Sequence, residues 1–241
     1  MPRYFIELAY QGAAYSGFQV QKNANSVQAE VEKALQVFYR QQFELTGSSR
    51  TDAGVHALQN FFHFDSPIPL ADASYQLNAI LPGDIVIKNI GEVKADAHCR
   101  FDALSREYRY YIYHQKNPFI ADTAYYYPYA LNFDLLQEAA AAILQHNDFT
   151  AFSKRNTQVK SFLCDIYSSE WLQEEDQLVY QVKANRFLRG MVKGLVGTML
   201  LAGRGKISVA GFKKIIESKD PSKVDFSVPS QGLFLCKVQY P

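Results

Sequence analysis

Alternation of apolar and polar positions marks several strands along the chain. Residues 4–9 (YFIELA) place Tyr4, Ile6 and Leu8 on one face, which predicts a first strand. Residues 105–114 (SREYRYYIYH) carry aromatic side chains on both faces, a pattern typical of a strand that is buried on both sides. A short apolar run at Phe43 and Leu45 is also strand-like. Further strands are predicted around residues 60–64, 85–89, 161–172, 178–184 and 233–238.

Helical spacing of apolar residues separates these strands. The first helix is expected to begin at Asn25 as its N-cap, with Gln28 completing a capping box. Asn185 to Ala202 is the most apolar helical stretch, and its glycines at 190, 194 and 197 share one face. Other helices are predicted at residues 71–80, 133–145 and 209–217. Strands in runs broken by helices favour an α+β fold.

Composition limits the class of protein. The chain has 241 residues, of which 48% are hydrophobic and 20% charged, so it can bury a sizeable core. Its net charge of +1 means that a polyanionic partner must be bound by a local basic patch. Three widely spaced cysteines without a C-x-x-C pair indicate a reducing compartment and argue against a disulfide framework or a zinc site. Without a signal-peptide pattern or an apolar run of membrane-spanning length, we expect a soluble cytoplasmic protein.

One segment combines candidate chemistry with a flexible backbone. Residues 47–57 (GSSRTDAGVHA) place Arg50, Asp52 and His56 among small residues, which allows a tight bend and close approach of a large ligand. Arg50 and Asp52 are two apart, so an extended backbone would project both from one face. By chemistry alone, a surface loop with a simple ion pair accounts for the segment equally well.

Common cofactor motifs are absent from the sequence. It has no G-x-x-x-x-G-K-[ST] phosphate loop, no G-x-G-x-x-G after a strand and no G-x-S-x-G nucleophile elbow. His56 and His63 are seven apart and have no cysteine or acidic partner at metal-ligand spacing. We therefore interpret both as structural or substrate-facing and not as zinc ligands. Chemistry without a cofactor remains the main catalytic option.

Several segments along the chain form a recognisable series around the RTDAGVH motif. They are Gly17-Phe18-Gln19, Ser26-Val27-Gln28, Arg50-Thr51-Asp52-Ala53-Gly54-Val55-His56, Asn78 with Leu81-Pro82 and Asp84, Ala97-His98-Cys99-Arg100-Phe101, Tyr108-Arg109-Tyr110, Asn147-Asp148-Phe149-Thr150, Phe187-Leu188-Arg189-Gly190-Met191-Val192-Lys193 and Gly232-Leu233. In this order the segments resemble the tRNA pseudouridine synthase A family over nearly the whole chain. Two departures from the family are Phe18, where tryptophan is commoner, and Lys193, where arginine is usual.

The resemblance implies a pseudouridine synthase fold. It consists of two related ferredoxin/RRM-like α+β halves, here residues 1–104 with the catalytic Asp loop and residues 105–241. Their strands join in a mixed, mostly antiparallel sheet with helices on one face, and the active cleft lies between the halves. Family members are homodimers, so a homodimer is expected.

The resemblance also implies an isomerase that converts uridine to pseudouridine in the tRNA anticodon arm, at tRNA positions 38 to 40. Asp52 is then the catalytic carboxylate, without a metal or other cofactor. Breaking the N-glycosidic bond and rejoining uracil through carbon involves no redox change, so one ionised carboxylate can suffice. It can act as a nucleophile at C1′ or as a base that removes a sugar proton, and the sequence leaves both routes open.

Supporting roles follow from the same resemblance. Lys193 is expected to pair with Asp52, Tyr108 to stack on the target base, and Leu233 to line the uracil pocket. Arg50 is expected to contact a phosphate or the flipped nucleotide. The candidate tRNA-binding residues are Arg100, Arg106, Arg109, Arg155, Arg186 and Arg189, with diffuse help from Arg204 and Lys206.

Two other functions fit parts of the pattern. A non-catalytic RNA-binding or RNA-folding module would use the same arginines and aromatic residues without chemistry. A carboxylate-based nucleoside hydrolase would release free uracil. The joint presence of Asp52, Tyr108 and Lys193 argues against the binding module, because a protein that only binds RNA has no need of a buried acid. An assay for free uracil would show or exclude the hydrolase.

Overall fold

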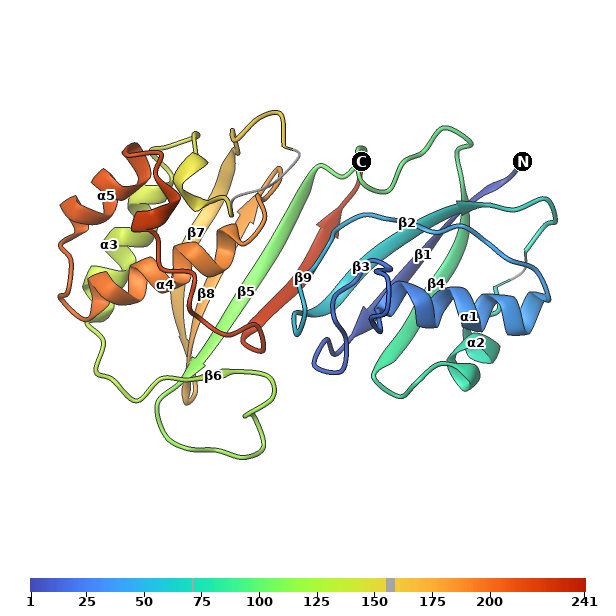
Figure 1. Cartoon of the computed structure of the whole chain (residues 1–241), viewed down its shortest axis with the longest axis horizontal. Helices are drawn as coiled ribbons and strands as arrows, with labels where there is room; N and C mark the ends of the chain where they lie inside the picture. The colour runs from blue at the N-terminus through green and yellow to red at the C-terminus, as the bar shows by residue number, and fades with distance from the viewer. Residues whose placement is uncertain (71, 155–158) are drawn as a thin grey trace. The chain divides into compact units, whose positions relative to one another are not determined.

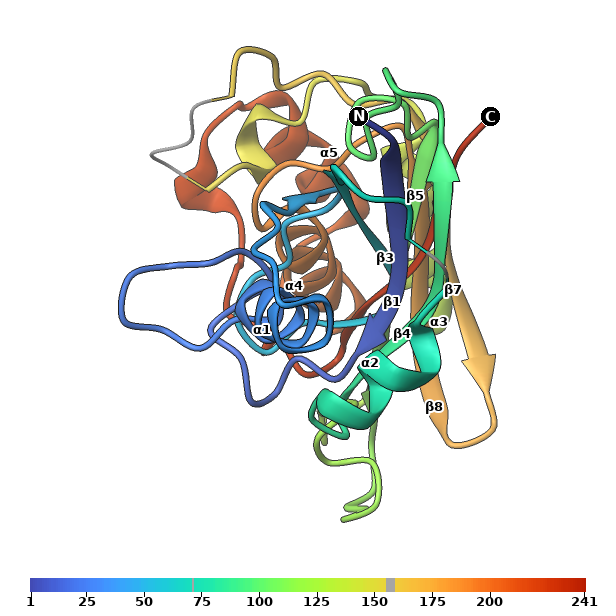
Figure 2. The same ribbon diagram turned by 90° about the vertical axis from the view of Figure 1, so that its right-hand side faces the viewer.

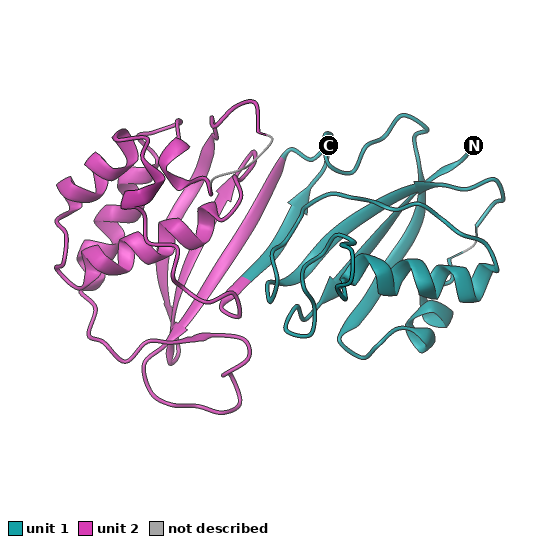
Figure 3. Ribbon diagram, in the orientation of Figure 1, with its two compact units in different colours: residues 1–104, 234–241 teal, residues 105–233 magenta. Residues whose placement is uncertain are grey.

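A computed structural model describes residues 1–70, 72–154 and 159–241 of the chain. Ala71, the first residue of one predicted helix, lies outside the described residues. The chain divides into two compact units: unit 1 contains residues 1–104 and 234–241, and unit 2 contains residues 105–233 (Figure 3). The final strand therefore belongs largely to unit 1, although the chain enters it from unit 2. No helix in the described part of the chain is long and apolar enough to cross a bilayer.

Unit 1 has a mixed sheet in the order β4-β1-β3-β9, with α1 against one face of its strands (Figure 2). β1 is antiparallel to both β3 and β4, whereas β9 runs parallel to the start of β3. The short β2 pairs with the other end of β3. Its elements are β1 (Arg3–Tyr10), α1 (Val27–Tyr39), β2 (Thr46–Gly47), β3 (His56–Asp65), α2 (Ser74–Ile80), β4 (Ile85–Val93) and β9 (Leu233–Gln239).

Unit 2 is built on β8, which lies antiparallel between β5 and β7, while β6 pairs parallel with β5. The helix α3 packs on β7 and contacts α4 and α5 (Figure 1). Its elements are β5 (Ser105–Tyr113), β6 (Tyr125–Tyr126), α3 (Phe133–Ile143), β7 (Ile166–Glu174), β8 (Gln177–Ala184), α4 (Met191–Gly203) and α5 (Val209–Glu217), with two short 3₁₀ turns, Thr150–Phe152 and Pro221–Lys223. Helices and mixed strands in both units confirm the α+β class.

The alternation in β1 is confirmed, because Tyr4, Ile6 and Leu8 are all buried. On the buried side of the unit 1 sheet, the ring of Phe18 stacks on Phe62 at a centroid distance of 4.4 Å. Burial of such apolar surface at about 25 cal/mol per Å² is the main stabilising term for each sheet.

The predicted cap of α1 is wrong. The N-cap is Ser26, whose backbone is extended (φ −142°) and whose hydroxyl accepts the N–H of Ala29 at 3.2 Å. Asn25 instead uses its carbonyl to accept the N–H of Ser16 at 2.9 Å. Gln28 does not close a capping box, because its side-chain oxygen accepts the N–H of Val20 at 3.2 Å.

Two further boundaries differ from the sequence prediction. Phe43 and Leu45 are not in a strand, and a short strand, β2, begins only at Thr46. The most apolar helix begins at Met191 and not at Asn185, because Gly190 adopts a left-handed φ of 75° at its N-cap. Asn185 is bound to the side chain and backbone of Asp165, at 2.8 and 3.0 Å, which holds it at the end of β8.

Candidate active site

Asp52 lies in the connection between β2 and β3, and this connection is bound to the long loop of residues 11–25. Asp52 forms an isolated antiparallel bridge with Gly17, and the N–H of Phe18 donates to the carbonyl of Thr51 at 3.1 Å. The N–H of Gly54 donates to the carbonyl of Tyr15 at 3.3 Å. Backbone bonds between the two loops therefore position the half-buried Asp52.

Side chains of β1 and β3 also form hydrogen bonds with the connection that carries Asp52. The hydroxyls of Tyr10 and Thr51 are 2.7 Å apart, and Asn60 donates to the carbonyl of Ser49 at 3.0 Å. The amide of Asn60 also donates to Tyr10 at 3.3 Å. Thr51 and Asn60 are buried, whereas Arg50 is exposed. Buried hydrogen bonds of this kind are costly to break, so they restrict the backbone on both sides of Asp52.

Two glycines permit the close approach of the loops. A Cβ at Gly12 would clash with the backbone carbonyl of Val55. Gly17 has a φ of 127°, and a Cβ there would lie 3.1 Å from the carbonyl of Thr51. A side chain at either position would separate the long loop from the segment that carries Asp52.

The ring of His56 makes two structural contacts, one through a nitrogen atom and one through its face. Its Nδ1 accepts the N–H of Gly12 at 3.2 Å, and its ring stacks on Phe234 at a centroid distance of 4.5 Å. His56 is 1% exposed. It thus joins the long loop and β9 to the start of β3.

Unit 2 brings together Lys193 and Leu233. The ammonium of Lys193 donates to the hydroxyl of Ser230 at 3.3 Å, and the N–H of Leu233 donates to the carbonyl of Ser230 at 2.9 Å. Gly232 makes this turn possible, because its carbonyl accepts the N–H of Tyr111 at 2.8 Å and a Cβ there would meet the same strand.

Tyr108 lies on β5 and is half-buried. Its ring meets the edge of Phe187 at a centroid distance of 5.1 Å and an interplanar angle of 83°. Such T-shaped pairs are favourable for aromatic rings and orient them. Phe187 also belongs to the segment that leads into α4, so one segment contacts Tyr108 and carries Lys193.

Lys193 occupies the first turn of α4, three residues after the N-cap Gly190. A cation there faces the positive end of the helix dipole, which is unfavourable unless an anion lies close. No acidic residue occupies that first turn. The position of Lys193 is therefore suited to binding a negatively charged group.

The candidate tRNA-binding arginines differ in their contacts. Arg100 and Arg189 are exposed. Arg106 donates to the carbonyl of Asn185 at 3.0 Å, and Arg109 lies 3.4 Å from a carboxylate oxygen of Glu174. Arg186 is half-buried, as is Arg204, whose guanidinium stacks on Tyr129 at 3.9 Å, whereas Lys206 is exposed. Arg155 lies outside the described residues.

Sequence reasoning missed several supporting residues. Ser230 lies in a polar loop without a recognisable motif, and its contacts depend on the fold of unit 2. In the sequence, Tyr10 and Asn60 look like ordinary strand residues. Only the register of β1 on β3 brings them close to each other and to the segment of Ser49 and Thr51. Phe187 carried a signal, because it starts the segment that ends at Lys193.

The structure gives His63 a cysteine partner that the sequence spacing did not reveal. His63, His98 and Cys99 form a cluster in unit 1 whose potential ligand atoms all lie within 4.8 Å of one another. Burial lowers the pKa of His63 to about 4, and the nearby His98 and Arg3 act in the same direction. The imidazole of His63 is therefore neutral near pH 7.

Comparison with known proteins gives one consistent result. A family model described as tRNA pseudouridine synthase matches residues 8–102 and 139–241. The chain is similar to tRNA pseudouridine synthase A of Parabacteroides distasonis, with 43% identity over 100% of this chain and 97% of that protein. It is 45% identical to the protein of the same name from Porphyromonas gingivalis, covering 100% and 98% of the two chains. The corresponding Staphylococcus aureus protein is 38% identical over 98% of this chain and 91% of its own length.

Proposed function

The chain belongs to the tRNA pseudouridine synthase family, and we propose that Asp52 is the carboxylate with which it converts uridine to pseudouridine. The protein is an isomerase that acts on tRNA uridine. We further propose that its targets lie in the anticodon arm, at tRNA positions 38 to 40, and that it works as a cytoplasmic homodimer. The RTDAGVH motif supports the choice of Asp52, while the target positions and the homodimer follow from the resemblance of the whole chain to the family.

The observation that carries the proposal is the way the backbone holds Asp52. Its segment is bound to Gly17, Phe18 and Tyr15 by backbone contacts and to Tyr10 by a buried side-chain bond. A reacting carboxylate needs such support, because misplacement by about 1 Å can cost two orders of magnitude in rate. A loop that merely carried a surface ion pair would not need it.

The reaction requires little more than a positioned carboxylate. The bond from C1′ to N1 of uracil breaks, the base turns, and a bond from C1′ to C5 forms. The hydrogen on C5 leaves as a proton and N1 takes up a proton, so the product is an isomer of the substrate. Asp52 can attack C1′ as a nucleophile or remove a proton from the sugar as a base. Both routes conserve atoms and electrons without an oxidant or a reductant.

We propose that Tyr108, Lys193 and Leu233 complete the site. The first-turn position of Lys193 favours an anion partner, and pairing with a carboxylate would keep that carboxylate ionised. Tyr108, oriented by Phe187, would stack on the extruded base, and Leu233 would contact the uracil. Extruding a base costs a few kcal/mol, which contacts to the tRNA backbone must offset.

The proposed tRNA contacts are Arg50, Arg100, Arg106, Arg109, Arg186 and Arg189. Arg50, Arg100 and Arg189 are exposed, so a phosphate can approach their side chains. Arg109 would first have to leave Glu174, so we expect its contribution to be smaller. A local cluster is needed because the whole chain carries a net charge of only +1.

Release of tritium from tRNA transcripts labelled at uracil C5 tests the role of Asp52. Asp52→Asn should reduce release by more than about 10³-fold, because the variant lacks an ionised carboxylate at the reacting centre. Asp96→Asn makes the same chemical change at an exposed carboxylate and should leave release unchanged. Replacement of the anticodon-arm uridines in the transcript should abolish release by the wild type.

Binding measured on the same proteins separates the alternatives. Asp52→Asn should still bind tRNA, as followed by fluorescence anisotropy. Loss of binding together with loss of release would favour an RNA-binding module. Free uracil in the wild-type reaction would indicate a nucleoside hydrolase, and full release by Asp52→Asn would exclude Asp52 as the catalytic group.

A further inference from the structure

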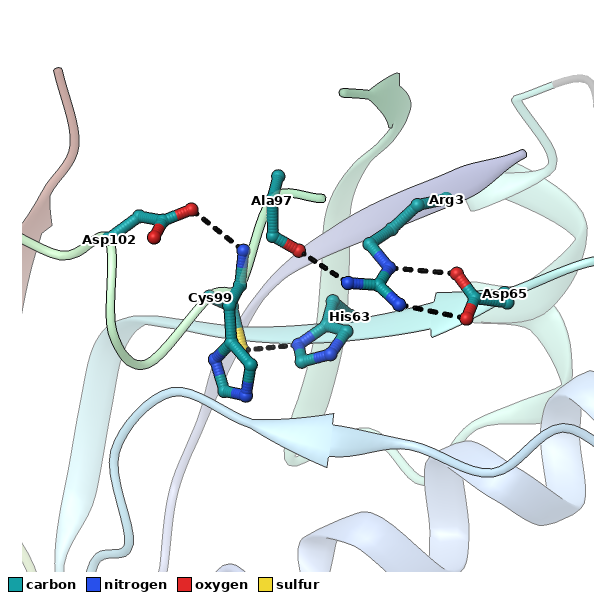
Figure 4. Close-up of polar contacts among 7 residues, drawn as sticks. Arg3, His63, Asp65, Ala97, Cys99 and Asp102 are labelled. Carbon is teal, nitrogen blue, oxygen red and sulfur yellow. Dashed lines mark hydrogen bonds and ion pairs between the residues drawn. The ribbon is translucent and has the colours of Figure 1, made fainter. Parts of the chain in front are cut away.

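A compact group of histidine and cysteine side chains lies in unit 1. His63 is near the end of β3, and Cys99 contacts it from the turn that follows β4 (Figure 4). His98 precedes Cys99 in the same turn. The Nδ1 of His63 is 3.1 Å from the Sγ of Cys99, and the His63 and His98 rings are 4.5 Å apart. In the strand order β4-β1-β3, β1 lies between β4 and β3. The turn after β4 therefore reaches past β1 to contact His63 on β3.

We propose that His63, His98 and Cys99 bind a transition-metal ion, in the first place Zn²⁺. Two imidazoles and one thiolate form a borderline-soft ligand set of the kind that Zn²⁺ prefers over harder cations. All three potential ligand atoms lie within 4.8 Å of one another, so one ion can reach all of them. Three protein ligands leave a fourth tetrahedral position for water.

The spacing of the cluster fits a zinc ion with small movements. Zinc–sulfur and zinc–nitrogen bonds of about 2.3 and 2.0 Å place the two ligand atoms about 3.5 Å apart in a tetrahedron. The present separation between Cys99 Sγ and His63 Nδ1 is 3.1 Å. On binding, the ion would replace the thiol proton of Cys99, which leaves to solvent. The hydrogen bond that this thiol donates to the carbonyl of Thr46 at 3.2 Å would then be lost.

The turn that carries two of the ligands is preformed. The carboxylate of Asp102 accepts the N–H of His98 at 2.7 Å, and Arg3 donates to the carbonyl of Ala97 at 2.9 Å (Figure 4). The hydroxyl of Tyr240 donates to the carbonyl of Cys99 at 2.6 Å. Such outer contacts orient metal ligands and reduce the ordering cost of binding.

The cost of binding at His98 is small. Its Nδ1 accepts the backbone N–H groups of Arg100 and Phe101 at 3.2 and 3.4 Å, which are long hydrogen bonds. A modest rotation of this half-buried ring exchanges them for a metal bond. His63 and Cys99 are 6% and 0% exposed, so the ion would be largely shielded from water.

The proposed site is separate from the isomerase chemistry. His63 lies seven residues beyond His56 on β3, a rise of about 23 Å along the strand, whereas Asp52 precedes the start of that strand. The bound ion would join β3 to the turn after β4, two segments that are 36 residues apart in sequence. Its effect is therefore expected on stability and not on the chemistry at Asp52.

Titration of the metal-free full-length protein with Co²⁺ tests the proposal, with Zn²⁺ as competitor. One equivalent of Co²⁺ should give the absorption of a tetrahedral site together with a thiolate-to-cobalt charge-transfer band, and Zn²⁺ should displace both. Cys99→Ala should lose the charge-transfer band, and His98→Gln should weaken Co²⁺ binding by at least about a hundredfold. His114→Gln, at an exposed histidine in unit 2, should bind as the wild type does.

The double variant Cys164→Ala/Cys236→Ala keeps the test decisive if Cys99→Ala does not fold. It retains Cys99 as its single cysteine and should keep the complete cobalt spectrum. A folded wild type without the band, a band that survives Cys99→Ala, or loss of the band from the double variant would each overturn the proposal. Asp52→Asn should keep the cobalt spectrum, so failure of the isomerase proposal is distinguishable from failure of this one.

Discussion

At the scale of single residues, the position of Asp52 depends on neighbours that carry no charge. Thr51, the residue before Asp52, is buried and its hydroxyl contacts that of Tyr10. Arg50, one residue earlier, is exposed. The alternation of buried and accessible side chains keeps Asp52 accessible while its backbone is restrained. Loss of a side-chain contact to this segment should therefore lower the rate of isomerisation more than loss of an equally stabilising contact elsewhere in the unit.

Tyr10→Phe tests this restraint. The change leaves the buried Thr51 hydroxyl and the Asn60 amide without the Tyr10 oxygen, at a cost of about 1–3 kcal/mol in the free energy of unfolding. We expect kcat for tritium release to fall about tenfold, with little change in KM. Tyr4→Phe is the matched control on the same strand, since its buried hydroxyl accepts the N–H of Leu70 at 3.0 Å. An equal fall in kcat for both variants would contradict the prediction.

Lys193 permits a second test at this scale. Lys193→Met removes the cation from the first turn of α4 and should lower kcat about 10²-fold, as expected for loss of one electrostatic contact in an active site. Lys193→Arg should retain most of the activity, because it keeps a positive charge at this position. Single-turnover rates would measure both effects. Lys214→Met, at an exposed lysine of α5, should match the wild type, and full activity of Lys193→Met would remove Lys193 from the proposed site.

At the scale of elements, helix ends are decided by hydrogen bonds that the local sequence does not specify. The residue before a helix can cap it only if its side chain is directed at the first turn. Asn25 and Ser26 are both good capping residues, but the backbone bond between Asn25 and Ser16 leaves the cap to Ser26. The long loop, which also positions Asp52, thereby determines where α1 begins.

Ser26→Ala should destabilise the protein by about 1 kcal/mol, because the N–H of Ala29 loses its acceptor at a fully buried position. Asn25→Ala should cost less, since its carbonyl keeps the bond to Ser16. Urea unfolding followed by circular dichroism would give both free energies. A larger loss for Asn25→Ala would mean that Asn25 is the effective cap in solution.

At the scale of the whole molecule, a net charge of +1 is too small to attract tRNA without local clustering. In the proposed function a few exposed arginines supply that clustering, and the salt dependence of binding reports the number of phosphate contacts. Release of counterions makes the logarithm of affinity fall linearly with the logarithm of salt concentration. The slope is therefore a property of the complete tRNA-binding surface.

Arg100→Ala and Arg189→Ala should each reduce that slope by about one and weaken binding similarly for different tRNAs. Lys33→Ala removes an exposed charge from α1 and should leave the slope unchanged. Fluorescence anisotropy titrations with tRNA at a series of salt concentrations would measure this slope. An unchanged slope in both arginine variants would place the phosphate contacts elsewhere on the protein.

Much of this protein was determined by local sequence. The period of two in β1 and the helical spacing in α5 predict both elements, because side-chain order decides which face of an element is apolar. The RTDAGVH motif identifies the family and singles out Asp52. The remaining motifs follow in the family's order along nearly the whole chain, and agreement of that length does not arise by chance.

Other features were decided only by the tertiary structure, because they depend on residues distant in the sequence. Cys99 reaches His63 across 36 residues through the turn after β4, and Ser230 meets Lys193 across 37. The start of α4 at Met191 follows from the left-handed backbone of Gly190 and from the bonds between Asn185 and Asp165. Periodicity reports which face of an element is buried, but the partner of each side chain is chosen by the packing of the whole unit.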